Sequence, residues 1–218
     1  MDFDVHKVDK RRKFVFYTGG KIMPVSMIHL FVAKKVNPDA NIDFYVGNLA
    51  LDGSIDEKLK NKAHFYDVPD REDALRKFAL KANNDYLKGM VLHLFADKKF
   101  HAFWNENTPF PYQEGEDWSE FEKRAKYTER NRKINSHAYH NTEWAYSLYK
   151  EMENWDFDGF VETEYIKKED VKWFIPWQHE RLMKNKLASS SVFPPALVEK
   201  LVNDTAEDFN KWFSNLKS

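Results

Sequence analysis

The chain has 218 residues, and its 34 basic and 35 acidic side chains leave a net charge of −1. This balance gives no electrostatic reason to expect nucleic acid or an acidic membrane surface as a partner. The absence of Cys excludes disulfides and Cys-ligated zinc, so any metal site would consist of His, Asp, Glu and water. With 42% hydrophobic and 16% aromatic residues, the chain carries enough apolar material for one domain with a core.

The first 22 residues are polar and basic, and a helical pattern begins only after them. We expect residues 1–22 to be an N-terminal extension upstream of the natural start, with translation beginning at Met23. The alternative is a short edge strand in which Phe14, Phe16 and Tyr17 alternate. There is no signal-peptide-like segment and no apolar run of about 18 residues, so we expect a cytoplasmic protein without a transmembrane segment.

Helices are expected throughout the first half of the chain, because apolar residues recur at i, i+3 and i+4 spacing. Asp70 is a good N-cap for one of them. Residues 42–51 are a short apolar run that could also form a strand, and we favour a helix there. The expected segments, in chain order, are 24–36, 42–51, 71–82 and 85–105.

The second half also has a helical pattern, in three segments at 118–153, 169–186 and 195–216. The first of these is long and highly charged, with a break expected near Asn135. Pairs of opposite charge at i, i+4, such as Glu120 with Arg124, favour a helix there. The Ser- and Pro-rich residues 189–195 are the clearest linker. We therefore predict a mainly α protein in which residues 23–218 form a single domain.

One helix carries polar side chains among its apolar residues. His93, Asp97 and His101 follow one another at i, i+4 spacing and lie within or along the buried face of the helix expected at 85–105. A buried carboxylate is costly unless it is paired or binds a metal ion, and this spacing suits a divalent ion. In the alternative interpretation, both histidines are hydrogen-bonded core residues and Asp97 pairs with Lys98 or Arg76.

Further metal-binding side chains favour the metal interpretation. His29 lies within an apolar helical segment, Asp52 ends an apolar run, and His64 comes just before another expected helix. Together with the polar side chains of segment 85–105, they predict a helical bundle around a His/Asp metal site. Mixed ligands of this kind suit zinc, or alternatively iron or manganese, and carboxylates can bridge two ions.

Four short motifs follow one another over residues 23–104. They are MPVSMIHLFVAKKV with His29, GNLALD with Asp52, the pair His64-Phe65, and KGMVLHLFAD with His93 and Asp97. In their order and spacing, these motifs resemble those of the bacterial zinc-dependent phospholipase C family.

The resemblance implies an α-helical fold around a cluster of metal ions, and hydrolysis of a phosphodiester. It also implies that His29 binds one ion and that Asp52 is the catalytic base for an attacking water. The residues implied to hold the other ion or ions are Asp52, His64, His93 and Asp97. The chain departs from the family pattern at Leu51, where Pro is common, and it lacks an N-terminal Trp ligand and a late His-x-x-x-Glu motif. These departures favour one or two ions over three.

Other histidines have weaker patterns. His137 and His140 lie at i, i+3 with Glu143 close by, which indicates either a second ion or substrate site, or a surface or partly buried polar pair. The His-Glu pair at 179–180 begins like a zinc-protease motif, but Met183 stands where the second His would be needed. We therefore expect residues 179–180 on a surface helix.

These patterns predict a metal-dependent hydrolase of phosphodiesters or related esters, with a metal-activated water as the nucleophile. Its substrate would be a small-molecule or lipid-derived phosphoester. An HD-type phosphohydrolase is disfavoured, because none of the eight His is followed by Asp. The alternative function is a helical ligand- or protein-binding protein with a structural or vestigial metal site, for which the aromatic segments WDFDGF and VKWFIPWQHE would supply apolar surface.

Overall fold

A computed structural model describes residues 25–54, 56–113 and 115–216, and the extension predicted for 1–22 lies outside them. Within these ranges the chain forms ten α-helices and a short 3-10 helix, without a strand. The predicted mainly α fold is thus confirmed. The elements are α1 (Ser26–Val36), α2 (Ile42–Ala50), η1 (Leu51–Gly53), α3 (Glu57–Ala63), α4 (Arg71–Lys81), α5 (Asp85–Asn107), α6 (Trp118–Ala125), α7 (Tyr127–His140), α8 (Ala145–Glu153), α9 (Lys168–Lys184) and α10 (Pro195–Leu216).

The helices predicted for the first half begin and end close to the expected residues, because local capping signals are present. The Asp70 carboxylate accepts a hydrogen bond from the Asp73 amide at 2.9 Å, as expected for an N-cap. Asn84 caps α5 in the same way, through the Leu87 amide at 2.8 Å. The short helix α3 was not predicted. It is capped by Asp56 and adds few apolar residues of its own.

The long helix expected over 118–153 is divided into three helices, and the break predicted near Asn135 is wrong. The first break is at Lys126, which adopts a left-handed conformation with φ 46° and ψ 43°, and the second spans residues 141–144. Asn135 lies inside α7, where its side-chain oxygen accepts a hydrogen bond from the Met27 amide at 3.0 Å. This bond joins α7 to the start of α1.

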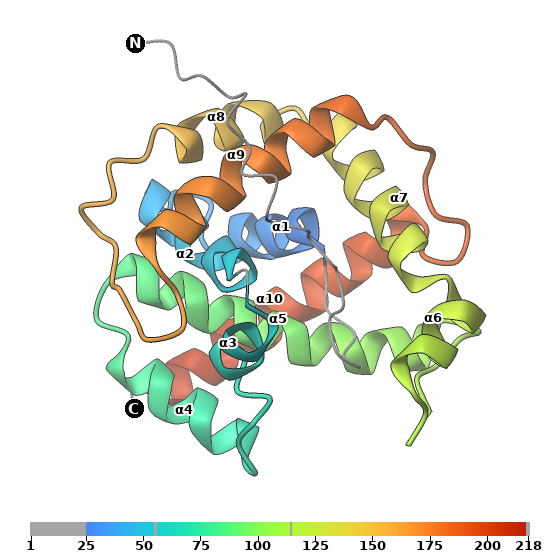
Figure 1. Cartoon of the computed structure of the whole chain (residues 1–218), viewed down its shortest axis with the longest axis horizontal. Helices are drawn as coiled ribbons and strands as arrows, with labels where there is room; N and C mark the ends of the chain where they lie inside the picture. Colours follow the sequence, from blue (N-terminus) through green and yellow to red (C-terminus); the bar gives the residue numbers. More distant parts are fainter. Residues whose placement is uncertain (1–24, 55, 114, 217–218) are drawn as a thin grey trace.

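Helix α1 lies in the middle of the molecule, with α2, α5, α7 and α10 packed around it (Figure 1). Every residue from Ser26 to Leu30 is buried, so this segment contributes to the core on all sides of the helix. The imidazole of His29 is therefore buried in the core and does not face solvent.

Helices α2 and α5 approach each other so closely that only glycine fits at two positions. A Cβ atom added to Gly47 would lie 2.0 Å from the Tyr86 carbonyl oxygen, and one added to Gly89 would lie 2.1 Å from the Phe44 carbonyl oxygen. The side-chain Nδ2 of Asn48 donates to the Gly89 carbonyl oxygen at 3.2 Å. This contact places the backbone of α2 beside the polar side chains of α5.

The 3-10 helix η1 is held against α9. The Cα of Gly53 lies close to Phe174, since a Cβ added to the glycine would be 3.4 Å from the Phe174 Cβ. This packing positions Asp52, the middle residue of η1, at the edge of the core. Across the described ranges, no helix combines the length and apolar character that crossing a membrane would require.

Candidate metal centre

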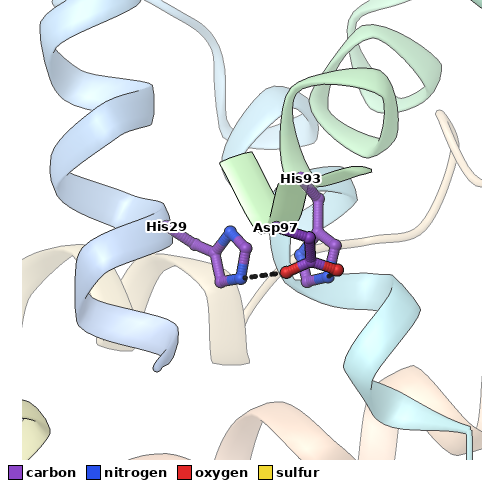
Figure 2. Close-up of side chains that lie close together, drawn as sticks. All are labelled: His29, His93 and Asp97. Carbon is purple, nitrogen blue, oxygen red and sulfur yellow. Dashed lines mark ion pairs between the residues drawn. The ribbon is translucent and has the colours of Figure 1, made fainter. Parts of the chain in front are cut away.

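Five predicted ligands converge in the core: His29 from α1, Asp52 from η1, His64 from the end of α3, and His93 with Asp97 from α5. In the described part of the chain, two groups of three side chains have ligand atoms within 4.8 Å of one another. One group is His29, His93 and Asp97, which Figure 2 shows, and the other is Asp52, His64 and His93. The convergence predicted from the sequence is therefore present.

Asp97 faces all three imidazoles, and the oxygen nearest to His29 is not the one nearest to His64 and His93. Its Oδ1 is 3.4 Å from His29 Nε2, whereas its Oδ2 is 3.6 Å from both His64 Nε2 and His93 Nε2. Ligand atoms bound to one tetrahedral zinc ion at its usual bond lengths are about 3.3–3.5 Å apart. The three distances around Asp97 are close to this spacing, so each of its oxygens could share an ion with the imidazoles that it faces.

Hydrogen bonds to the backbone fix the orientation of two imidazoles. His93 Nδ1 is 2.7 Å from the Asn48 carbonyl oxygen, and His64 Nδ1 is 2.7 Å from the Lys60 carbonyl oxygen. A carbonyl oxygen only accepts, so each Nδ1 carries the proton and each neutral ring keeps a lone pair on Nε2. The two Nε2 atoms are 3.1 Å apart. Two lone pairs at this distance repel each other unless a cation lies between them.

Several polar atoms of the centre are buried without a hydrogen-bond partner. They are both ring nitrogens of His29 and both carboxylate oxygens of Asp97. Leaving a buried polar group unpaired costs about 1–3 kcal/mol, and a charged group costs more. Three of these atoms, His29 Nε2 and the two Asp97 oxygens, fit a bound cation, which would accept a lone pair from each side chain.

The three imidazoles do not take up a proton in place of that cation, because burial lowers their pKa values. Burial lowers the pKa of His29 to about 4, although the carboxylate of Asp52 opposes this shift. Burial, and then the neighbouring imidazole of His29, lowers the pKa of His93 to about 4, and burial holds the pKa of His64 well below its usual range. All three imidazoles are thus neutral near pH 7, which is the form that binds metal ions.

The two carboxylates of the centre differ in their surroundings. Burial raises the pKa of Asp97 to about 6, although His93 and Arg71 oppose the shift. Burial also acts to raise the pKa of Asp52, but the ammonium of Lys60 and the nearby imidazoles outweigh it and hold this pKa below its usual range. Lys60 Nζ lies 2.8 Å from Asp52 Oδ1. Asp52 is therefore ionised, and its side chain is 14% exposed.

The remaining predicted ligands do not belong to either group of converging side chains. The half-buried ring of His101 packs against Tyr112. On α7, His140 Nε2 donates to the Leu182 carbonyl at 2.9 Å, and His137 Nδ1 accepts from the side-chain Nδ2 of Asn141 at 3.2 Å. Glu143 is exposed. A metal-binding role for these four residues stays a prediction.

The alternative partners proposed for Asp97 are not its neighbours. Lys98 pairs with Glu72, and Arg76 is exposed. The nearest cationic side chain is instead Arg71, whose Nη2 is 3.8 Å from Asp97 Oδ2. Sequence patterns did not single out Arg71 or Lys60, because each lies on a charged helix and looks like an ordinary surface residue.

The surface position expected for residues 179–180 is wrong for His179. Its ring is fully buried, Nδ1 donates to Glu153 Oε1 at 2.6 Å, and Nε2 accepts from the Tyr139 hydroxyl at 2.8 Å. The ring also stacks on Tyr149 at a centroid distance of 4.9 Å. Helix α9 packs against α7 and α8, and this packing brings His179 into the core.

A cavity of about 440 Å³ lies beside α1, between α7 and α10. Phe31, Trp144 and Phe193 are among the apolar residues that line it, and Lys34 and His137 are among its polar ones. His137 thus faces a cavity that is distinct from the converging His/Asp side chains.

The chain matches no family model, no curated protein and no solved structure. Its resemblance to the zinc-dependent phospholipases C stays a prediction that depends on four short motifs. The geometry of the centre is therefore the basis for any functional conclusion.

Proposed function

We propose that the protein is a metal-dependent hydrolase of phosphodiesters or related esters. The observation that carries this proposal is the set of unpartnered buried atoms on His29 and Asp97, beside two imidazoles whose Nε2 atoms are 3.1 Å apart. Such an arrangement has a large free-energy cost without a cation and a small one with it. Because stability alone would favour apolar side chains at these positions, the polar set indicates a functional site.

Zinc is the ion that we propose first, with iron or manganese as alternatives. Three imidazoles and two carboxylates form a nitrogen- and oxygen-rich set that suits these metals, whereas calcium and magnesium prefer oxygen alone. Asp97 has one oxygen on each side of the centre, which supports one or two ions. When bound, such ions make water a stronger nucleophile and stabilise negative charge on phosphoryl oxygens.

The residues have separate roles in this proposal. His64, His93 and Asp97 Oδ2 hold one ion, and the backbone carbonyls behind the two rings keep Nε2 directed at it. His29 and Asp97 Oδ1 hold the second position. Asp52 is ionised, and we propose that it orients the attacking water and accepts its proton.

The differences in exposure indicate the side from which substrate would enter. The side chains of His29, His64, His93 and Asp97 are inaccessible to solvent. By contrast, the side chains of Asp52, Lys60 and Arg71 are 14%, 18% and 29% exposed. The centre is therefore closed on the imidazole side, and a substrate would approach past these three residues.

Metal analysis and hydrolysis of bis(4-nitrophenyl) phosphate by the full chain test this proposal. Asp97→Asn keeps the size of the side chain but removes its charge, so we expect it to lower bound zinc and to abolish hydrolysis. Asp208→Asn, an exposed carboxylate on α10, is the matched control and should change neither measurement. Less than about 0.1 ion per wild-type chain after zinc loading, where about one to two ions are expected, would contradict the proposal.

A second candidate function is ligand binding, and the cavity beside α1 favours it. Its volume of about 440 Å³ is within the range of small-molecule sites, and its walls are mostly apolar with a few polar groups. Binding of an apolar fluorescent anion such as anilinonaphthalene sulfonate to chelator-treated protein would test it. Ala138→Phe, which fills part of the cavity, should abolish such binding, and unchanged binding would rule out this cavity as the site.

A further inference from the structure

We infer that Arg71 is an anion-binding residue whose guanidinium contacts a non-bridging phosphoryl oxygen of the substrate at the metal centre. This inference rests on the proposed function, and it narrows the substrate class to esters with a negatively charged phosphoryl group. It is carried by the position of one guanidinium nitrogen, which is buried at the centre without a hydrogen-bond partner.

The guanidinium of Arg71 is held in place from two directions. Its Nε donates a hydrogen bond to the His64 carbonyl oxygen at 3.1 Å, and its carbon lies over the ring of Tyr66 at 4.4 Å from the centroid. Arg71 is also the first residue of α4, which the Asp70 side chain caps. A long side chain that is anchored at Nε loses little further conformational entropy when its outer nitrogens bind a ligand.

The outer nitrogen Nη2 points toward the centre. It lies 3.8 Å from Asp97 Oδ2, which is too far for a hydrogen bond, and solvent does not reach it. By contrast, Lys60 Nζ makes a close contact of 2.8 Å with Asp52. Asp97 Oδ2 also faces the imidazoles of His64 and His93. Nη2 is therefore a preoriented donor without an acceptor.

A phosphoryl oxygen supplies the acceptor that this geometry lacks. An oxygen bound next to Asp97 Oδ2 would face Nη2 on one side and the metal position on the other. Guanidinium groups form strong charge-assisted hydrogen bonds with phosphate, and such donors stabilise the charge that develops as a phosphoester is cleaved. A neutral ester would leave Nη2 buried and unpaired, which disfavours its binding.

The charges at the open side of the centre agree with this assignment. Lys60 and Arg71 are both partly exposed, Lys60 next to the partly exposed Asp52 and Arg71 near the buried Asp97. Once Asp97 binds metal ions, Arg71 loses its nearest negative partner, and its guanidinium is available to an anionic substrate. The entrance would then attract negatively charged molecules and not neutral ones.

Inorganic phosphate is the probe for this inference, titrated calorimetrically into zinc-loaded full-length protein that has been freed of excess metal. We expect Arg71→Gln to weaken phosphate binding about 10- to 100-fold, because it removes one charged hydrogen bond. Zinc content should remain at the wild-type level. Arg76→Gln, an exposed arginine on the same helix, is the matched control and should bind phosphate like the wild type.

A second variant tests the geometry of the side chain. Arg71→Lys keeps the positive charge but loses the Nε donor that anchors the side chain to His64. We expect it to weaken phosphate binding nearly as much as Arg71→Gln does, since a lysine ammonium is a mobile point charge. Full phosphate affinity in Arg71→Lys would overturn the assignment of an oriented guanidinium, because charge alone would then suffice.

Two further outcomes would overturn the inference. If Arg71→Gln binds phosphate with wild-type affinity but loses zinc, Arg71 is only a counter-ion that supports Asp97. If acetate binds the zinc-loaded wild type as tightly as phosphate does, the site does not select phosphoryl groups. Failure of the proposed function itself looks different, because the wild-type chain would then take up no metal at all.

Discussion

The centre around Asp97 contains three imidazoles that solvent does not reach, and the cluster around His179 contains one. They differ in the completeness of their hydrogen bonds. Both nitrogens of His179 have protein partners, namely Glu153 at 2.6 Å and Tyr139 at 2.8 Å. Both nitrogens of His29 and both oxygens of Asp97 lack one.

This difference teaches that burial of a histidine does not by itself indicate a ligand site. The His179 ring lies between a carboxylate and a phenol and stacks on Tyr149, so it needs nothing from outside the chain. In the centre around Asp97, buried polar atoms have no hydrogen-bond partner, and a cation would supply one. We therefore propose that the cluster around His179 serves stability and that the centre around Asp97 binds metal, and three variants test this distinction.

His93→Leu should have the largest effect, because it removes a ligand from the centre. We expect undetectable hydrolysis and a loss of zinc-dependent stability, which amounts to about 3–4 kcal/mol when free zinc exceeds its Kd by 100- to 1,000-fold. In thermal melts, chelator should lower the melting temperature of the wild type and leave that of the variant almost unchanged. The metal-free variant should lose only about 1–2 kcal/mol, as the Asn48 carbonyl no longer has its donor.

Equal chelator sensitivity in wild type and His93→Leu would remove His93 from the proposed ligands. No sensitivity in either protein would mean that the polar side chains of α5 serve a purpose other than metal binding. Either result would contradict the proposal that the centre around Asp97 binds metal and the cluster around His179 does not.

His179→Leu should have the next largest effect, and it should act on stability alone. The change leaves Glu153 Oε1 and the Tyr139 hydroxyl without their donor and acceptor on His179, which costs about 2–3 kcal/mol in the free energy of unfolding. Chemical denaturation measures this loss, while zinc content and chelator sensitivity should match the wild type. A drop in bound zinc at unchanged stability would show that His179 supports the metal centre and not the packing of α9.

His137→Gln should have the smallest effect. The ring is only partly buried and bonds to Asn141 at the end of its own helix, so the free energy of unfolding should change by no more than about 0.5 kcal/mol. Zinc content should also stay the same. Loss of one zinc ion per chain in this variant would restore His137 to the ligands and place a second site at the cavity beside α1.

Most helices were predictable because the signals that specify them are local. Asp70 and Asn84 stand directly before the helices that they cap, and apolar spacing marked α1, α5 and α10. The break at Lys126 was not predictable, since it lies in a left-handed residue that is neither Gly nor Asn. In place of the predicted ion pair with Glu120, Arg124 forms one with Glu116, which lies before the start of α6.

The candidate site was predictable in part for the same reason. His93 and Asp97 are one helical turn apart, so their proximity follows from the helix alone. His29, Asp52 and His64 joined them only through an ordered set of short motifs. Arg71 gave no signal at all, since a charged residue at the start of a helix is usually a solvated one.

The sequence by itself determined the helical segments, their caps and the pairing of His93 with Asp97, because these depend on residues within a few positions of one another. Only the tertiary structure decided which buried histidines have hydrogen-bond partners for both ring nitrogens. The contact of α2 with α5 through Gly47 and Gly89 turns a backbone carbonyl toward His93, and the packing of α9 supplies both partners of His179. Whether a buried polar atom has a hydrogen-bond partner depends on atoms that are distant in the sequence, so a local sequence pattern does not predict it.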